Sequence, residues 1–534
     1  MTALVRNEGS KMMGETSLKA CVLMSIFLLG MVCTAAAGRT IYVDADANGI
    51  NDGASWTDSY RYLQDALSAA VSGDEIWVAH GIYKPDANSA NPSGTGDRYA
   101  TFQLVSGVAL KGGYAGFGQP DPNVRDFELN ESILSGDLDG NDVEVNDPCD
   151  LLNEPTRAEN SYHVLNGSGT DPNAILDGFT ITGGYANGSD RQNRRGGGMY
   201  NTDSSVTILS CAFKWNLSRG WGGGLYNSNS RSKLINCTFI GNSRSGMYNY
   251  ESALTLTRCT FRRNLTPYYG GGIFNDFGTQ ITLIECIFRG NNSYKEGGGI
   301  FNNYGSLSSV LTNCIFVGNH AGSYGGGIFN GLNELLLTNC TFVGNSAGDE
   351  GGGLFIPPLP SPSVSSSSTA YYGYSIITNC IFWDNLPEQI VDLGSVISVV
   401  YSDIQGSWPG VGNIDDDPFF ADLNNGDCHL KSQAGRWDPD TNSWVLDDVN
   451  SPCIDVGDPT IPIGNEPFPN GGVINMGAYG GTAEASKSYF GRPPCEIIIA
   501  GDINGDCKVN WFDFQLMALH WLEDNSTPPP PLPP

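Results

Sequence analysis

Basic residues are scarce in this chain of 534 residues. The 28 lysines and arginines face 57 aspartates and glutamates, and the formal net charge is −29. A nucleic-acid-binding protein needs a basic stripe that neutralises phosphates, so the composition argues against that class. The charge also disfavours an anionic membrane surface. It suits an acidic extracellular protein, although a solvated surface alone would give the same balance.

Long apolar runs are also scarce. The run Ala20–Val32 follows two lysines and precedes the small residues 35–37, a pattern typical of a signal peptide over residues 1–37. An uncleaved N-terminal anchor, or a lipoprotein signal at Cys33, is the alternative. No second apolar run of about 18 residues follows, so we expect no transmembrane domain in the mature chain and a secreted or cell-surface location.

Residue patterns that mark several enzyme classes are missing. The glycine triplets are not followed by Lys-Ser or Lys-Thr, so they are not phosphate loops. The sequence contains no zinc-ligand spacing and no Ser-His-Asp phrase. His163 and His320 have no partner signal, and such isolated histidines are typical of structural positions.

A short phrase recurs in place of these motifs: Cys, any residue, Phe, two variable residues and Asn. Successive copies lie 22 to 28 residues apart, except for a last interval of 40 that contains a Pro- and Ser-rich insertion at 357–369. A second phrase, Gly-Gly-Gly, apolar, aromatic, Asn, lies between copies. A period of about 20–50 residues indicates stacked supersecondary units. The first phrase begins at Cys211, Cys237, Cys259, Cys286, Cys314, Cys340 and Cys380.

The repeat predicts short strands joined by sharp bends. Apolar residues alternate before each Cys, as at Leu254 and Leu256, and a period of two indicates a strand with one buried face. Asn236, just before Cys237, is typical of the left-handed backbone that a tight corner requires. We predict an all-β fold, a right-handed parallel β-helix (solenoid) in which equivalent Cys, Phe and Asn residues stack about 4.8 Å apart.

The two phrases together resemble the repeats of polymorphic outer-membrane proteins and, more broadly, the pectate-lyase-like β-helix superfamily. The resemblance covers roughly residues 175–385. It implies a bacterial secreted or surface protein and a fold that many polysaccharide-active enzymes share. The repeated residues themselves build the coil and carry no activity.

The remaining chain predicts flanking parts around the repeats. Leu63, Ala66, Leu67 and Ala70 lie at helical spacing and predict an N-terminal capping helix within 60–70. The acidic stretch 137–159 predicts an exposed loop, with calcium binding as an alternative. The predicted parts are a signal peptide (1–37), an N-terminal cap with irregular first coils (38–174), regular repeats (175–404), a C-terminal cap (405–482), a linker (483–500), a small EF-hand/dockerin-like module (501–524) and a Pro-rich tail (525–534).

Two groups of cysteines are distinguished among the 14 in the chain. Seven belong to the repeated phrase, where neighbouring coils are about 4.8 Å apart while the Cβ atoms of a disulfide are about 3.8 Å apart. We therefore expect these seven to be buried thiols that pack as small apolar groups. The candidates for disulfides are Cys428 with Cys453 and Cys495 with Cys507.

A calcium-loop pattern lies near the C-terminus. Oxygen-bearing side chains at positions 1, 3, 5, 9 and 12, with a backbone carbonyl at position 7, wrap one hard cation. The stretch resembles a dockerin repeat, which implies calcium and a cohesin-like partner. Cys507 stands where glycine is usual and a single repeat is visible, so an Asp- and Asn-rich turn is the alternative. The predicted ligands are Asp502, Asn504, Asp506, Lys508, Asn510 and Asp513.

The residues that precede the glycine triplets form one further candidate site. If these positions stack, Trp221, Tyr269 and Tyr324 offer aromatic faces for sugar rings. Glu296 and Glu350 would lie two coils apart, about 9.6 Å, which is compatible with the carboxylate pair of an inverting glycosidase. The alternative is that all five are ordinary surface residues beside a bend.

Two classes of function remain from the sequence. The first is a non-catalytic β-helix that binds polysaccharide, surface glycan or matrix, favoured because every recurring residue has a structural role. The second is an extracellular polysaccharide lyase or glycoside hydrolase. A groove with several carboxylates, or an Arg–carboxylate cluster, would favour the enzyme. A flat side covered by Asn and Ser would favour the binder.

Overall fold

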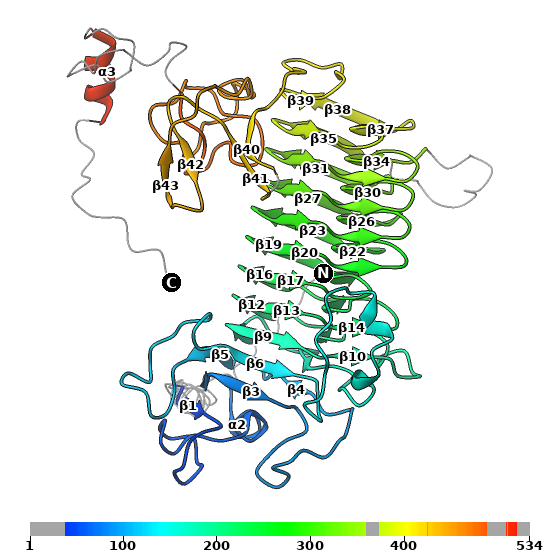
Figure 1. Ribbon diagram of the computed structural model, residues 1–534, viewed down its shortest axis with the longest axis vertical. Helices are drawn as coiled ribbons and strands as arrows, with labels where there is room; N and C mark the ends of the chain where they lie inside the picture. The colour runs from blue at the N-terminus through cyan, green and yellow to red at the C-terminus, as the bar shows by residue number, and fades with distance from the viewer. Residues whose placement is uncertain (1–37, 359–372, 424, 489–508, 510, 521–534) are drawn as a thin grey trace, which may run out of the picture.

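The chain winds into a solenoid of three parallel sheets that share one axis (Figure 1). The computed structural model describes residues 38–358, 373–423, 425–488, 509 and 511–520. Each complete coil contributes one strand to each main sheet, as the short strands and bends of the repeat predict, and the turns at the two ends contribute fewer.

Sheet 1 has 12 strands and forms the first side of each coil. Its members are β1 (Thr40–Val43), β2 (Glu75–Ala79), β5 (Ala109–Tyr114), β8 (Ile175–Asp177), β12 (Thr207–Leu209), β16 (Lys233–Ile235), β19 (Ala253–Thr257), β23 (Gln280–Ile284), β27 (Ser308–Thr312), β31 (Glu334–Thr338), β35 (Tyr374–Thr378) and β38 (Val396–Val400).

Sheet 2 has 11 strands and carries the Cys-x-Phe phrase. Its members are β3 (Gly81–Tyr83), β6 (Ser132–Ser135), β9 (Phe179–Thr182), β13 (Ala212–Lys214), β17 (Thr238–Ile240), β20 (Thr260–Arg262), β24 (Ile287–Arg289), β28 (Ile315–Val317), β32 (Thr341–Val343), β36 (Ile381–Trp383) and β39 (Asp403–Ile404).

Sheet 3 has 10 strands and carries the residues that follow the glycine triplets. Its members are β4 (Phe102–Gln103), β7 (Leu165–Asn166), β11 (Met199–Thr202), β15 (Leu225–Ser228), β18 (Met247–Tyr250), β22 (Ile273–Asn275), β26 (Ile300–Asn302), β30 (Ile328–Asn330), β34 (Leu354–Ile356) and β37 (Ile390–Asp392).

Two small parallel sheets lie between sheets 2 and 3, and all of their strands except β10 directly follow the Asn of the repeated phrase. One pairs β10 (Tyr185–Ala186) with β14 (Leu217–Ser218), and the other contains β21 (Leu265–Thr266), β25 (Asn292–Ser293), β29 (His320–Ala321) and β33 (Ser346–Ala347).

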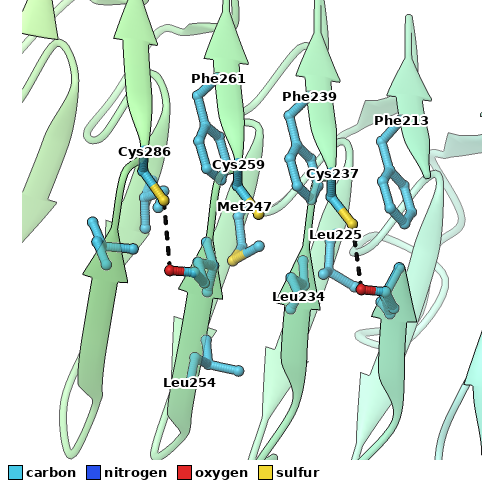
Figure 2. Packing of buried hydrophobic residues seen from close by; sticks show 14 of the residues in the cluster. Phe213, Leu225, Leu234, Cys237, Phe239, Met247, Leu254, Cys259, Phe261 and Cys286 are labelled. Carbon is cyan, nitrogen blue, oxygen red and sulfur yellow. Dashed lines mark hydrogen bonds between the residues drawn. The ribbon is translucent and has the colours of Figure 1, made fainter. Parts of the chain in front are cut away.

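The core of the solenoid consists of stacked identical side chains (Figure 2). Phe213, Phe239 and Phe261 are fully buried, and the ring centroids along this ladder lie 4.8 and 4.7 Å apart. The seven repeat cysteines are buried free thiols, as predicted. Cys237 and Cys286 donate to carbonyl groups of the preceding coil, which satisfies the thiol without a bridge.

The predicted corners are confirmed in the backbone. Asn236, Asn313, Asn339 and Asn379 have φ angles between 50° and 55°. Asparagine tolerates this left-handed conformation because its short side chain makes local hydrogen bonds. The corner turns the chain from sheet 1 into sheet 2 and points the next Cys inward.

The predicted Asn ladder is formed within the described coils. Asn291 is typical: its Nδ2 donates to Phe261 O at 2.8 Å and to Asn319 Oδ1 at 2.9 Å. Its Oδ1 accepts from the backbone N–H and the side chain of Asn264. A second ladder, which the sequence analysis did not anticipate, joins the Asn residues of sheet 3 from Asn201 to Asn330. Buried amides paired in this way cost little and fix the register of the coils.

Short helices lie near the N-terminal coils. α2 (Leu63–Ala69) falls within the predicted segment and buries Leu63, Ala66 and Leu67 in the main core. It lies beside β1, the edge strand of sheet 1 (Figure 1). Its predicted role as the cap of this end stays a prediction. The single-turn helices η1 (Asp150–Leu152) and η2 (Pro155–Arg157) lie in the acidic loop.

Residues 405–488 lie along the side of the solenoid (Figure 1). The hairpins β40 (Phe420–Asp422)/β41 (Asp427–Leu430) and β42 (Arg436–Asp438)/β43 (Ser443–Val445) belong to this segment. Asn313 Nδ2 donates to Ala478 O at 2.8 Å, and Ala478 N donates to Thr341 Oγ1 at 3.0 Å.

This lateral position differs from the end-cap position expected for 405–482. Trp408 of this segment packs against the main core cluster. The later residues cover outward-facing apolar side chains of sheet 2, including Ile315, Val343 and Ile381. Burial of that apolar surface explains why the segment lies beside the coils.

The predicted disulfide between Cys428 and Cys453 is not formed. Both are buried free thiols. Cys453 Sγ donates to Asp403 Oδ2 at 3.1 Å, whereas Cys428 packs with Ile315 and Val343 in a different cluster. The two thiols lie in different clusters, so the prediction of a disulfide between Cys428 and Cys453 is wrong.

Other sequence-based expectations lie outside the described residues. They include the signal peptide, the Cys495–Cys507 pair, and the predicted calcium ligands Asp502, Asn504, Asp506, Lys508 and Asn510. α3 (Trp511–His520) lies within the segment 501–524, and Asp513, the last predicted calcium ligand, belongs to it. Among the described residues, no helix is both long enough and apolar enough to cross a membrane.

Candidate functional site

An aromatic column covers the outer face of sheet 3. In each strand the apolar residue after the glycine triplet points inward, so the next residue points outward. Rings of the column stack or meet edge to face, with centroids 4.8 to 5.6 Å apart from Tyr226 to Phe355. Each ring is at most 5 % exposed. The column consists of Tyr226, Tyr248, Phe274, Phe301, Phe329 and Phe355.

The predicted aromatic residues partly cover this column. The ring of Tyr269 stacks on Phe301 at 4.7 Å, and the ring of Tyr324 stacks on Phe355 at 4.6 Å. Trp221 stacks on Tyr248 at 5.5 Å. These upper rings are only partly buried, so one face of the layer remains available to solvent.

A groove of about 620 Å³ lies over the later part of the column, and we call it the aromatic groove. Four of the five predicted site residues line it; Trp221 does not, and packs at its edge against Phe274. The lining residues are Tyr269, Phe274, Glu296, Phe301, Asn303, Tyr304, Tyr324, Phe329, Glu350, Phe355, Pro357, Pro358 and Leu393.

The register confirms that the predicted positions stack on successive coils. Gly270 N donates to Glu296 O at 3.1 Å, and Gly297 N donates to Tyr324 O at 3.0 Å. Tyr324 and Glu350 form a parallel bridge. Glu296 and Glu350 therefore lie two coils apart with Tyr324 between them, which corresponds to about 9.6 Å by strand spacing.

Glu296 is a half-buried carboxylate of this groove. Its Oε2 is buried and has no hydrogen-bond partner among the described residues. Burial raises the pKa of Glu296, and the neighbouring Lys295 opposes this shift only in part. The Lys295 Nζ lies 5.1 Å from the centre of the Tyr269 ring. A carboxyl group that keeps its proton to higher pH is suited to donate a proton or a hydrogen bond.

A second cleft, which the sequence analysis missed, lies between sheet 2 and the lateral segment. It has a volume of about 510 Å³ and contains three arginines and four aspartates. Arg289 Nη1 donates to Asn425 O at 2.5 Å, so the cleft walls come from segments more than 130 residues apart. No sequence signal joins these segments. The charged lining consists of Arg262, Arg289, Arg436, Asp422, Asp427, Asp438 and Asp440.

A buried histidine lies behind this second cleft. His429 Nδ1 lies 2.5 Å from Asp427 Oδ1, and its ring stacks on Tyr479 with centroids 3.5 Å apart. Burial lowers the pKa of His429, but hydrogen bonds with Asp427 and Glu484 outweigh burial and raise this pKa overall. His429 therefore packs within the wall of the cleft, between Asp427 and Tyr479.

The earlier histidines have structural positions. His163 is buried, and its Nδ1 lies 2.9 Å from Gly196 O, beside Tyr200. His320 is exposed in β29, with Nδ1 2.9 Å from Ser346 Oγ. Neither lines the aromatic groove or the second cleft.

Comparison with known proteins agrees with the sheet topology. The family described as "Right handed beta helix region" matches residues 164–316 and 197–371, and "Disaggregatase related" matches residues 395–457. Together the match and the topology define a right-handed parallel β-helix protein. No curated protein matches the chain.

Two solved structures have a similar arrangement. A crystal structure of pectate lyase Pel9A is 15% identical, covers 83% of this chain and 96% of its own, and has a TM-score of 0.44. A rhamnogalacturonan lyase is 14% identical, covers 78% of this chain and 96% of its own, and has a TM-score of 0.40.

Proposed function

We propose that the protein is a secreted or cell-surface β-helix that binds polysaccharide or surface glycan along the aromatic groove. The single observation that carries the proposal is the layer of half-buried rings, Tyr269 and Tyr324, set on a buried aromatic column beside two carboxylates. A sugar ring presents C–H groups to an aromatic face and hydroxyl groups to its edges. The groove supplies both kinds of partner.

The geometry favours a chain of sugars over a single sugar. Tyr269 and Glu350 lie three coils apart, about 14 Å by strand spacing, on a straight face. The rings are already packed by their neighbours, so binding would order few side chains and cost little entropy. Glu296, Glu350 and Asn303 would accept or donate hydrogen bonds at the ring edges.

Affinity measurements on a glycan panel test this proposal. We expect Tyr324→Ala and Tyr269→Ala to weaken the bound glycan about 3–10-fold each, the value of one aromatic contact. Tyr374→Ala is the matched control, because Tyr374 is an exposed tyrosine on sheet 1, away from the groove. Equal affinity in all three variants would refute binding at this groove.

A glycoside hydrolase is the second candidate, and the perturbed Glu296 favours it. In an inverting mechanism Glu296 would protonate the leaving oxygen while Glu350 activates water. The strand spacing between their positions, about 9.6 Å, lies just above the range of about 6.5–9.5 Å for such pairs, which the side chains can reach by leaning toward each other. This function would be favoured if the wild type releases product from a glycan and the rate of release falls at least about 100-fold in both Glu296→Gln and Glu350→Gln.

The charged second cleft supports a polysaccharide lyase as a further alternative. Such a reaction needs a basic residue that removes the proton next to a uronate carboxyl group, and Arg262 is an exposed arginine of the cleft. Appearance of unsaturated uronate from acidic glycans, lost in Arg262→Ala and kept in Glu296→Gln, would place the chemistry in this cleft.

The C-terminal motif completes the proposal. Asp502, Asn504, Asp506, Lys508, Asn510 and Asp513 would bind one calcium ion in a dockerin-like loop, and a cohesin-like partner would attach the protein to a larger assembly. The spacing of oxygen ligands supports this, since it follows the order of a calcium loop. Calcium titration of the wild type against Asp502→Asn/Asp506→Asn tests it.

A further inference from the structure

The aromatic groove contains the same small arrangement twice. In the first copy Tyr269 stacks on Phe301 of the following coil, with ring centroids 4.7 Å apart. The coil of Phe301 also carries Glu296, which lines the groove together with Tyr269. The Phe301 ring is 5 % exposed and supports the tyrosine from below. One tyrosine ring and one carboxylate are thus presented to the groove, and we call this pair a Tyr/Glu unit.

The second Tyr/Glu unit repeats these contacts two coils further on. Tyr324 stacks on Phe355 with ring centroids 4.6 Å apart, and the coil of Phe355 carries Glu350. Because successive coils are one strand spacing apart, the two units lie about 9.6 Å from each other along the solenoid axis. The groove therefore repeats one kind of chemistry at a fixed interval.

The charge of the groove has a single sign. Its described lining contains two glutamates, Glu296 and Glu350, and no lysine, arginine or histidine. In the part of the chain that the structure describes, no basic side chain lies within 4.0 Å of either carboxylate. Glu296 Oε2 is moreover buried there without a hydrogen-bond partner. A carboxylate in such surroundings favours a positively charged ligand and repels a negatively charged one.

The tyrosine rings add to this preference. The face of an aromatic ring is the negative part of its quadrupole and attracts a cation within about 6 Å of the ring centre. Lys295, an exposed residue outside the lining of the groove, already makes such a contact. Its Nζ lies 5.1 Å from the centre of the Tyr269 ring and donates to the hydroxyl of Tyr269 at 3.4 Å. A ring of this layer therefore accepts an ammonium group.

We propose that the aromatic groove recognises a β-1,4-linked chain of amino sugars whose ammonium groups are free. The inference rests on the proposed function, glycan binding at this groove, and names the class of glycan. In an extended β-1,4-linked chain every second sugar presents the same side, and two sugars have nearly the length that separates the two Tyr/Glu units. Ammonium groups two sugars apart would then each meet a tyrosine ring and a carboxylate. The sugar between them would lie over the coil of Phe329, which also lines the groove.

Calorimetry with three hexasaccharides of one linkage tests the charge preference. They are the β-1,4-linked hexamers of glucosamine, N-acetylglucosamine and glucose, measured on the full chain at mildly acidic pH, where the amines are protonated. We expect the glucosamine hexamer to bind at least about tenfold tighter than the other two, because they lack the cations. This preference should shrink as salt is added, since charge attraction in an open groove is screened.

Substitutions locate the preference in the Tyr/Glu units. Glu296→Gln and Glu350→Gln should each weaken binding of the glucosamine hexamer at least about threefold and change that of the glucose hexamer less than about twofold. Glu285→Gln is the matched control, because it removes the same charge from an exposed glutamate at the corner before sheet 2. Lys295→Met should strengthen binding of the glucosamine hexamer, because it removes a competing cation from the Tyr269 ring.

Four outcomes would overturn the amino-sugar assignment and leave glycan binding at the groove intact. They are no binding of the glucosamine hexamer, equal affinity for the glucosamine and glucose hexamers, weaker binding in Lys295→Met, and equal losses in Glu285→Gln and Glu350→Gln. The last result would show that the attraction follows net charge alone. If hexasaccharides bind and Tyr324→Ala changes the affinity for none of them, the assignment and the proposed function both fail.

Discussion

The phenylalanine ladder allows one stability prediction to be worked out in detail. Phe288 is fully buried, and its ring lies 5.0 Å from that of Phe261 and 4.7 Å from that of Phe316. Phe288→Ala removes a core ring, which costs about 3–5 kcal/mol. Both stacking contacts disappear as well, and the rigid coils on either side cannot close the space. We therefore expect a value in the upper half of that range.

Equilibrium unfolding in guanidinium chloride measures this loss. The midpoint should fall while the slope stays the same, because the surface exposed on unfolding hardly changes. Phe277→Ala is the control, since Phe277 is 56 % exposed, and we expect less than about 0.5 kcal/mol for it. A loss below about 1 kcal/mol for Phe288→Ala would refute the stacked core.

Three further predictions concern other buried groups. Asn291→Ala should destabilise the protein by at least about 3 kcal/mol in the same assay, because it leaves several buried partners unpaired. Burial raises the pKa of Asp403 and of Glu466 to about 7, from 3.8 and 4.5. The folded protein favours the protonated form of both carboxyl groups, so their contribution to the free energy of unfolding is full below about pH 4 and is lost as pH rises through about 7. Asp403→Asn should reduce this pH dependence when unfolding is measured between pH 4 and pH 8. Finally, Cys428 and Cys453 should both react with iodoacetamide in unfolded, unreduced protein, and a peptide linked between them would contradict the structure.

The periodic part of the fold could be predicted because each repeat specifies its own coil. The alternation of apolar residues predicted which side chains point inward, and Asn236 and its equivalents predicted the corners. Stacking of the coils at one strand spacing placed Glu296, Tyr324 and Glu350 in register. The ladder in sheet 3 was missed, although the Asn residues were visible, because their inward direction depends on the strand that follows the glycine triplet. The predicted register of Trp221 was correct, but its side chain packs at the edge of the aromatic groove and does not line it.

The sequence by itself determined the solenoid, because residues one period apart in the chain are neighbours in space and local alternation decides which side they face. The tertiary structure alone decided the lateral position of residues 405–488, the charged cleft with Arg289 and Asp427, and the separation of Cys428 from Cys453. These features join segments with no common period, so they depend on which apolar surfaces remain to be covered, and that is known only once the coils have formed.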